Sequence, residues 1–447
     1  MPPTSPAQAD TLLPATPPAG LPQLLTLFRP LARTGFLPPT APLLNLPGPF
    51  QPLLDAIPAL APAYQGSGVR AALLDLDAAL GDRRDDARQL GTAQQEALLS
   101  ATAILMHLYR WNAVPVAPVR FSERPDFPPH LHALFRDLSA AHHLPACGTM
   151  HTLKYLNWRS DALTPGEPYH AGQVQTGQVR IAHNWHASPA GDERDLAGQL
   201  DLWIQTFVLA EARGQAVLTA SAQALTAVQH HDRPALEAAL ADLHAAISAM
   251  TRQINALMRF RVVRSDLWRV FIQPTFGWGL PPEDGGAPLD GASGLQLGGT
   301  QVADLALGVP FDSNLGQALR HSRRSLTPPQ RALLHAWEPH RQVIRDAARD
   351  WGGSAAQDAF EASLNDLTRW RVSHRERGAV YLRGDGQAHV MASTGTQLNA
   401  GNPHEQAFRD LMNERIGETQ AQTLAGHPAG THGPDSKPLQ ARTREET

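Results

Sequence analysis

The sequence predicts a mainly α-helical protein, and three observations support this fold class. Long stretches repeat apolar residues every three or four positions, which is the period of a helix with one buried face. Strand patterns are scarce, and the best candidate is QVRIAHN at residues 178–184. Hydrophobic residues make up 42% of the 447-residue chain, which is enough for a substantial core.

Five stretches carry the helical spacing and form the expected core. They span residues 88–111, 198–229, 234–259, 327–351 and 354–383. The third has Pro234 in its first turn, where the missing N–H of proline costs no helical hydrogen bond. Segments 273–300 and 384–402 are rich in glycine and polar residues and predict two long loops, which in compact domains are commonly functional.

Composition excludes several classes of protein. The formal net charge of -4 gives no sign of a nucleic-acid partner. Cys147 is the single cysteine, so an intramolecular disulfide and cysteine-rich zinc or iron–sulfur sites are excluded. No apolar run approaches the roughly 18 residues of a membrane span, and the first residues lack the features of a signal peptide. We expect a cytoplasmic protein with no membrane partner, and a monomer.

Both ends of the chain differ in composition from the region between them. Residues 1–32 form a leader rich in proline and alanine, and residues 421–447 form a polar tail that contains glycine. Such segments bury too little apolar surface to offset the entropy of ordering, so both are expected to be disordered.

The 20 histidines are the main candidates for metal ligands. Three close pairs lack the helical spacing with an acidic neighbour that zinc hydrolases use, and are expected to face solvent or cap helices: His130 with His132, His142 with His143, and His230 with His231. His374 lies late in the last long helix, three residues after Arg371 and on nearly the same face. A heme requires one such imidazole on a rigid element. On pattern alone, an ordinary surface or core histidine is favoured. No nucleophile elbow, P-loop or dinucleotide motif occurs.

Seven segments, in order and with compatible spacing between about residues 33 and 420, resemble the indoleamine 2,3-dioxygenase family. They are RTGFLPPTAPLLNLP (33–47), LPACGTMHTLKYLNWR (144–159), DLWRVFI (266–272), GASGLQLGGTQVADLALGV (291–309), LTPPQRALL (326–334), LTRWRVSHRERGAVYL (367–382) and ASTGTQL (392–398). Each segment alone is weak, because single prolines and tryptophans are common. The resemblance implies a small N-terminal domain at residues 33–130 and a large helical heme-binding domain at residues 131–420.

The resemblance also assigns a cofactor, heme b, and the residues around it. His374 falls on the histidine that ligates the heme iron. Asp304 and Arg371 fall on positions that form a salt bridge beside the heme, and a buried aspartate without a cation would be costly. Ser293 falls on the serine of a loop near the distal side of the heme.

In this family an indole ring is opened by inserting both atoms of O2 across its C2–C3 bond. The partners implied are therefore an aromatic small molecule and O2. Arg269 falls on the arginine that holds the substrate carboxylate, since a guanidinium can bind a carboxylate with two hydrogen bonds; the alternative is a surface ion pair. Thr394, Gly395 and Thr396 fall on the mobile loop that closes over the substrate.

Several pocket positions depart from the family pattern. Arg264 replaces a distal aromatic residue, while Met150 and Leu153 replace a tyrosine and a cysteine. Lys154, one of two lysines in the chain, replaces an apolar residue. The added Arg264 and Lys154 would favour a more polar or acidic substrate, provided that both face inward.

In the helix that begins near Gln199, Glu211 matches a family glutamate and sets the register of the comparison. Trp203 then falls on a pocket phenylalanine, and Phe207 replaces a distal serine, which would reduce the space above the iron. These three residues share one helical stripe, and without the resemblance a packed core stripe is the favoured interpretation.

The leading function is dioxygenation of tryptophan or a related indole to an N-formylkynurenine-type product. One alternative is a heme enzyme with different chemistry, like the tryptophan-processing enzyme of pyrrolnitrin biosynthesis, which LWRVFIQPTFGWG (267–279) partly resembles. Another is a non-catalytic heme-binding or sensing protein, which the altered pocket positions suggest. A third is a helical scaffold without a cofactor.

Overall fold

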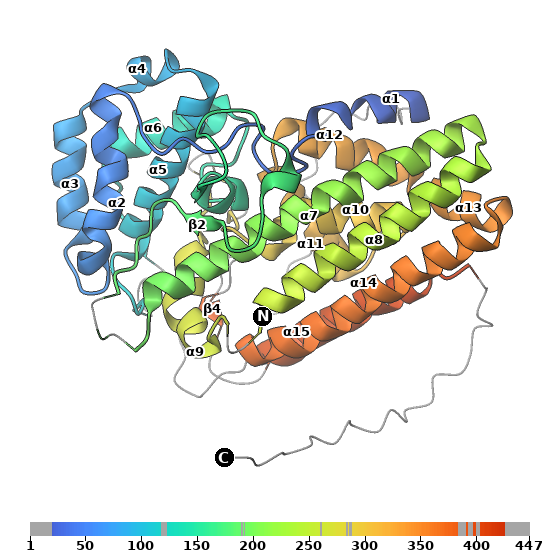
Figure 1. Cartoon of the computed structure of the whole chain (residues 1–447). Coiled ribbons are helices and arrows are strands. Elements are labelled where there is room, and N and C mark those ends of the chain that lie inside the picture. Colours follow the sequence, from blue (N-terminus) through green and yellow to red (C-terminus); the bar gives the residue numbers. More distant parts are fainter. Residues whose placement is uncertain are drawn as a thin grey trace.

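The computed structural model describes residues 20–424, apart from residues 118–122, 189–190, 192, 260–261, 283–284, 286–287, 383–389, 392–396 and 399–402. Helices dominate this part of the chain, which confirms the predicted fold class (Figure 1). None of the described helices is both long enough and apolar enough to cross a lipid bilayer.

The N-terminal helices form a group at one side of the molecule (Figure 1). They are α2 (Gln51–Tyr64), α3 (Val69–Leu80), α4 (Arg84–Arg88), α5 (Thr92–Trp111) and α6 (Pro129–Ala141). Helix α5 is the centre of this group, because all its residues from Ala97 to Trp111 are buried. Helix α6 packs on α3, α4 and α5. The division of the chain at residue 130 stays a prediction, and by its packing α6 belongs with the N-terminal group.

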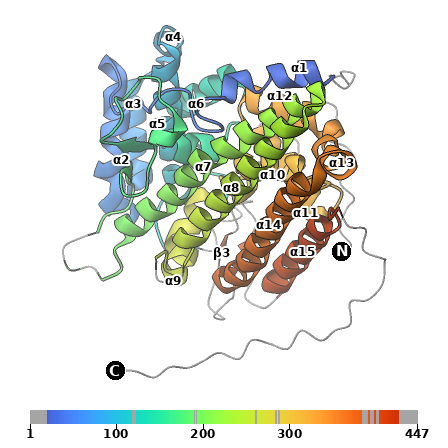
Figure 2. The same ribbon diagram turned by 45° about the vertical axis from the view of Figure 1, so that its right-hand side comes forward.

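Four long helices lie side by side in the order α7, α8, α14, α15 (Figure 2). Their bounds are Leu196–His230, Arg233–Leu257, Gly353–Leu382 and Pro403–Gln420. The shorter helices between α8 and α14 are α9 (Ser265–Leu267), α10 (Gly298–Ala306), α11 (Asn314–Ser322), α12 (Pro328–Trp337) and α13 (Val343–Asp350). Helix α10 packs against α7, and α11 packs against α15.

The sharp turn between α7 and α8 follows from local sequence. His231 adopts a left-handed conformation with φ of 54°, which ends α7. The Asp232 side chain then accepts a hydrogen bond from the Ala235 N–H at 3.1 Å and caps α8. Pro234 lies in the first turn of α8, as predicted. The two helices therefore return antiparallel and pack along their length.

Strands are few and short. The predicted strand at residues 178–184 is confirmed as β2 (Val179–Ile181), which pairs antiparallel with β1 (Trp158–Ser160). A second pair consists of β3 (Val390–Met391) and β4 (Gln397–Leu398), also antiparallel.

Three of the five predicted helices match α7, α8 and α14 to within about two residues at each end, and two need correction. The stretch 88–111 divides into the end of α4 and the later start of α5 at Thr92. The stretch 327–351 divides into α12 and α13, separated by a short 3-10 turn at Glu338–His340. Pro339 lies in this turn and cannot donate a helical backbone hydrogen bond.

The expectation of a disordered leader through residue 32 is wrong for residues 21–32. Helix α1 (Leu21–Thr26) and a 3-10 turn at Arg29–Leu31 occupy this segment. Leu24, Phe28 and Leu31 are buried in the core, so apolar burial orders a segment whose proline and alanine content suggested otherwise. At the other end, the described tail residues reach Leu424, which packs against the core and whose N–H bonds to Glu361.

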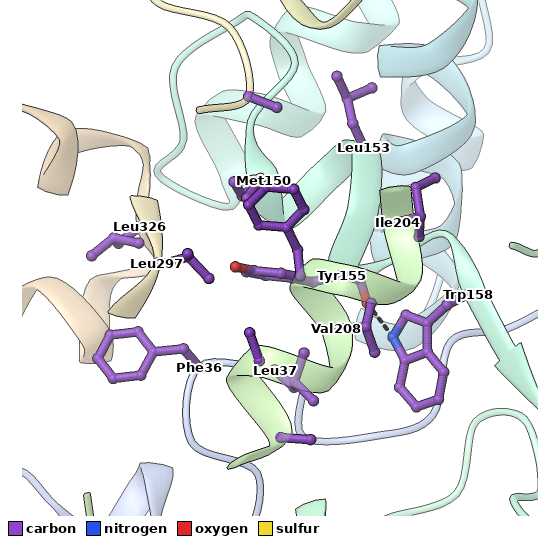
Figure 3. Close-up of a cluster of buried hydrophobic side chains, with 14 of the residues drawn as sticks. Phe36, Leu37, Met150, Leu153, Tyr155, Trp158, Ile204, Val208, Leu297 and Leu326 are labelled. Atoms are coloured by element: carbon purple, nitrogen blue, oxygen red, sulfur yellow. Dashed lines mark hydrogen bonds between the residues drawn. The ribbon is translucent and has the colours of Figure 1, made fainter. Parts of the chain in front are cut away.

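One continuous hydrophobic core joins the N-terminal helices to the long ones. Figure 3 shows a part of this core to which Phe36 and Leu37 of the N-terminal segment and Ile204 and Val208 of α7 contribute. Trp158 is fully buried beside them and donates its indole N–H to the Tyr155 carbonyl at 2.9 Å.

Candidate functional site

A cavity of about 360 Å³ lies among the long helices. Its walls come from α7, the end of α8, α10, α11, α14 and α15, together with the loop at residues 292–297. Two π-helical turns also contribute: η4 (His151–Tyr155) through Lys154 and η6 (Trp268–Ile272) through Trp268. The volume is within the range of small-molecule sites, and π-turns recur at functional sites because they break the regular hydrogen-bond ladder.

His374 lines this cavity from the last third of the 30-residue helix α14. Its ring stacks on Trp370, one helical turn earlier, with centroids 5.6 Å apart and planes 14° apart. Phe408 of α15 meets the ring edge-on at 5.8 Å. Among the described residues, none forms a hydrogen bond with either ring nitrogen.

The surroundings keep the His374 imidazole neutral. Burial lowers its pKa to about 4, and the positive charge of Arg377 adds to this effect. Neutral imidazole is the form of histidine that ligates a metal.

Gly378 makes room for the contact between Phe408 and His374. A Cβ atom at position 378 would lie 2.6 Å from the Cζ atom of Phe408, closer than atoms can pack. The glycine therefore lets α15 approach α14 beside the histidine, which fixes one side of the ring.

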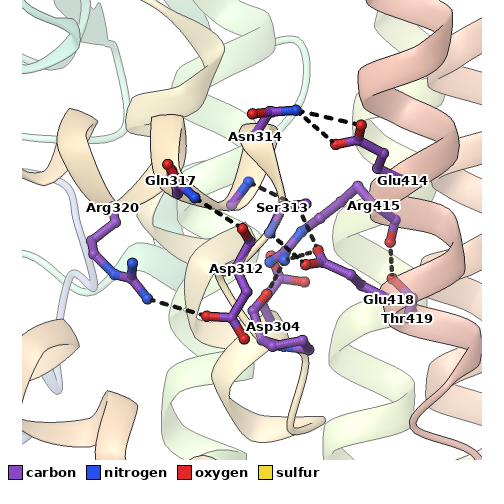
Figure 4. A network of polar contacts seen from close by, with 12 residues as sticks. Asp304, Asp312, Ser313, Asn314, Gln317, Arg320, Glu414, Arg415, Glu418 and Thr419 are labelled. Atoms are coloured by element: carbon purple, nitrogen blue, oxygen red, sulfur yellow. Dashed lines mark hydrogen bonds and ion pairs between the residues drawn. The ribbon is translucent and has the colours of Figure 1, made fainter. Parts of the chain in front are cut away.

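Asp304 of α10 is the centre of a buried charge cluster in the cavity wall (Figure 4). It forms ion pairs with Arg371 of α14 and, at 2.5 Å, with Arg415 of α15. Arg371 also donates to the Thr419 hydroxyl, and Arg415 pairs with Glu418 at 2.7 Å. The side chains of Asp304, Arg371 and Arg415 are each at most 3% exposed. Because water does not reach them, the two guanidinium charges are balanced by the carboxylates of Asp304 and Glu418.

Helix α10, which carries Asp304, is anchored to α7 by Glu211. The buried carboxylate accepts the Gly298 N–H at 2.6 Å and the Gly299 N–H at 3.0 Å, two groups that have no partner within the helix. The Tyr155 hydroxyl adds a third hydrogen bond at 3.2 Å. Burial raises the pKa of Glu211 to about 7, against the lowering effect of these hydrogen bonds.

Close backbone packing explains the two glycines at this joint. A Cβ atom at position 299 would lie 2.9 Å from the Cα of Gly214 on α7. One at position 298 would overlap the ring of Phe36, with contacts near 2 Å. A larger residue at position 299 would push α10 away from α7 and displace Asp304, and one at position 298 would clash with Phe36.

Lys154 occupies a different part of the wall, with its side chain among aromatic rings. The residue is 1% exposed and lines the cavity. Its Nζ atom lies 3.5 Å from the centroid of the Phe207 ring, 4.5 Å from that of Phe276 and 4.7 Å from that of Trp203. Burial lowers the pKa of its amine well below the usual value.

Seven of the residues singled out from the sequence line the cavity: His374, Arg371, Asp304, Phe207, Trp203, Ser293 and Lys154. They come from three helices, one loop and the π-turn η4. The salt bridge that the resemblance implies between Asp304 and Arg371 is present. Ser293 precedes the 3-10 turn η8 (Gly294–Gln296) and accepts a weak hydrogen bond from the Leu295 N–H at 3.3 Å.

Other predicted site residues lie elsewhere. Met150 and Leu153 are buried in the hydrophobic core of Figure 3 and are not among the residues that line the cavity. The condition that Arg264 faces inward is not met, because Arg264 is exposed and forms an ion pair with Asp266 at 2.8 Å. At the surface the guanidinium charge stays hydrated, whereas burying it without a partner would cost free energy.

Arg269 is half-buried in η6. It is not among the residues that line the cavity, although the preceding residue, Trp268, is one of them. Thr394, Gly395 and Thr396 lie outside the described residues.

Trp370, Phe408 and Arg415 are among the lining residues that the sequence did not single out. Trp370 had a usable signal, because it precedes His374 by four residues and therefore shares its helical face. Phe408 and Arg415 belong to α15, for which no helical pattern was recognised. Their approach to α14 and α10 is a tertiary contact that no local spacing reveals.

In the described part of the chain, no group of three or more His, Cys, Asp or Glu side chains is placed to hold a metal ion. In a heme the ring nitrogens of the porphyrin supply the other iron ligands, so one histidine from the protein is sufficient.

Comparison with known proteins gives one family and no curated relative. The sequence model of the family described as indoleamine 2,3-dioxygenase matches residues 26–265, just over half of the chain. No curated protein matches. The matched part contains Lys154, Trp203 and Phe207 and ends before Asp304 and His374. The extent of the match, together with the helical architecture, shows that the chain belongs to the indoleamine 2,3-dioxygenase family.

Proposed function

We propose that this chain is a heme-dependent oxygenase, with His374 as the protein ligand of the iron and an indole or related aromatic amino acid as substrate. The observation that carries the proposal is the His374 imidazole: it is neutral, has no hydrogen bond to a described residue and faces a cavity. A long helix and two aromatic rings hold it in place.

The residues around the cavity suit a heme. Trp370 and Phe408 offer flat apolar contacts beside the histidine, and the lining is mostly apolar. Arg371 and Arg415 already have acidic partners, so their charges are balanced without a ligand. In this proposal the Asp304 cluster orients α14 and α15 so that His374 keeps its direction. Members of the family depend on heme.

The chemistry that heme supplies when bound is the activation of O2, which in this family adds both oxygen atoms across the indole C2–C3 bond. The protein would contribute binding, orientation and exclusion of water. Trp203 and Phe207 offer aromatic faces against which an indole can pack, and they contact each other edge-on at 4.8 Å. Phe207 also fills space that a smaller residue would leave open.

Turnover of L-tryptophan tests the proposal directly. The heme-loaded protein is incubated with L-tryptophan, a reductant and ¹⁸O2, and the products are identified by mass spectrometry. We expect N-formylkynurenine that carries two labelled oxygen atoms. A different indole product would favour the pyrrolnitrin-type alternative. Normal heme and CO binding without turnover of any indole would contradict the enzyme assignment and favour a heme-binding or sensing protein.

A further inference from the structure

The Lys154 amine lies in the cavity wall, and no described acidic group is placed to balance its charge when it is protonated. It is 1% exposed, and no ion pair or hydrogen bond joins its Nζ atom to a described residue. The lining arginines differ from it, because Arg371 and Arg415 share Asp304, and Arg415 also pairs with Glu418. A buried ammonium without an anion is costly, so this position is suited to an anion that arrives with a ligand.

The aromatic rings define where that ammonium lies. Phe207, Phe276 and Trp203 surround the Nζ atom at 3.5 to 4.7 Å, and Trp203 and Phe207 also line the cavity. Ring faces attract a cation but do not accept hydrogen bonds from its N–H groups as carboxylate oxygens do. The rings therefore hold the amine in position without satisfying its hydrogen-bonding capacity.

Its location also fits the binding of an aromatic acid. The same two rings that hold Nζ present apolar surface to the cavity, so an aromatic ligand packed on them would bring its acidic group close to Lys154. Arg264 is exposed and ion-paired, and the Arg269 side chain is not among the lining residues. Burial disfavours the charged amine of Lys154, and a bound carboxylate would offset that effect.

We propose that Lys154 binds the carboxylate of the substrate, so that the protein selects indoles that carry an acidic group over neutral indoles. This inference rests on the proposed function and names the substrate class for the same cavity. Lys154 is then a specificity-determining residue that contacts the substrate.

Matched ligands and matched variants test this role. The probes are indole-3-propionate and its neutral amide, titrated into the heme-loaded full chain, with binding followed by the shift of the Soret band and by calorimetry. The wild type should bind the acid at least about tenfold more tightly than the amide, the usual gain from a charge-assisted hydrogen bond. Lys154→Met should lose most of this preference while its affinity for the amide changes little. The control Arg264→Met removes a surface charge and should keep the preference.

Several results would overturn the inference. One is wild-type protein that binds indole-3-propionate no more tightly than its amide, a result that does not depend on any variant folding. Another is a preference that survives in Lys154→Met. A large loss of heme affinity in that variant would assign Lys154 to the heme carboxylates, and a changed iron coordination spectrum would assign it to the metal. Wild-type protein that takes up no heme contradicts the proposed function instead, and the acid preference is then measured by calorimetry alone.

Discussion

Two parts of the cavity wall bury positive charge in opposite ways. At Asp304, two arginines from α14 and α15 share one carboxylate, and Thr419 and Glu418 complete their contacts. At Lys154, an ammonium lies among three aromatic rings, with no acidic partner among the described residues. The first arrangement is complete without a ligand, whereas the second is complete only when an anion is present.

This difference separates structural charge from ligand-directed charge. The Asp304 cluster joins three helices, so its removal should mainly affect folding. The three rings around Lys154 connect η4 to α7 and η7 (Gln273–Phe276) through contacts that are weaker than the buried ion pairs. Replacement of Lys154 should therefore mainly affect ligand selection. The following predictions test this separation.

Replacing Asp304 should give the largest change in stability. Asp304→Asn keeps the shape of the side chain and removes the charge that Arg371 and Arg415 share. We expect the free energy of unfolding to fall by about 3 to 5 kcal/mol, because a buried pair that loses one partner leaves uncompensated charge. Urea denaturation measures this.

The matched control is Asp312→Asn, because Asp312 is 77% exposed and lies 3.9 Å from Arg320. We expect a change of less than about 1 kcal/mol there. Similar losses for the two variants would remove the distinction between the Asp304 cluster and a surface ion pair.

The Asp304 cluster also depends on the joint between α10 and α7. Gly299→Ala places a methyl group 2.9 Å from the Cα of Gly214, a backbone atom that cannot move independently. We expect a loss of about 1 to 3 kcal/mol in thermal unfolding experiments. Gly417→Ala on α15 meets no atom within 4 Å and should instead stabilise by up to about 1 kcal/mol. If Gly299→Ala is also stabilising, α10 does not need this close approach.

The Lys154 region should show a smaller effect that depends on pH. Its amine has a lower pKa in the folded chain than its usual value of 10.5 in the unfolded chain. Between those two values the unfolded chain holds a proton that the folded chain has lost, so wild-type stability rises with pH, by at most about 1.4 kcal/mol per pH unit. Lys154→Met lacks this dependence. The variant should therefore be the more stable protein at pH 7.5, and its advantage should shrink by pH 9.5.

Urea denaturation of both proteins at the two pH values measures the difference. A gap between variant and wild type that stays constant across this interval would show that Lys154 keeps an ordinary pKa, and the contrast with the Asp304 cluster would then be weaker.

Helical periodicity predicted the parts of the fold that depend on one sequence window. It located α7, α8 and α14, and it placed Trp203 and Phe207 on one stripe. A local strand pattern located β2 in the same way. It failed where long-range packing decides the structure. Burial orders residues 21–32 despite their composition, and Pro339 divides a stretch whose apolar spacing is continuous.

Orientation was the harder problem for the candidate site. Lys154 and Arg264 were equivalent in the sequence as cations in place of apolar or aromatic residues. A π-turn directs Lys154 inward, while Arg264 has Asp266 two residues away and stays at the surface. Neither outcome follows from residue type. Arg415 reaches Asp304 across 111 positions of the chain, and no local pattern indicates that contact.

The most direct test of the central claim is the absorption spectrum of the purified protein beside His374→Ala, recorded as ferric, ferrous and ferrous-CO forms. His230→Ala, at the exposed end of α7, is the matched control. We expect a Soret band in the wild type and the control, and its loss or marked alteration in His374→Ala. Colourless wild-type protein that also fails to take up added hemin, or a spectrum unchanged in His374→Ala, would contradict the assignment of His374 as the heme ligand.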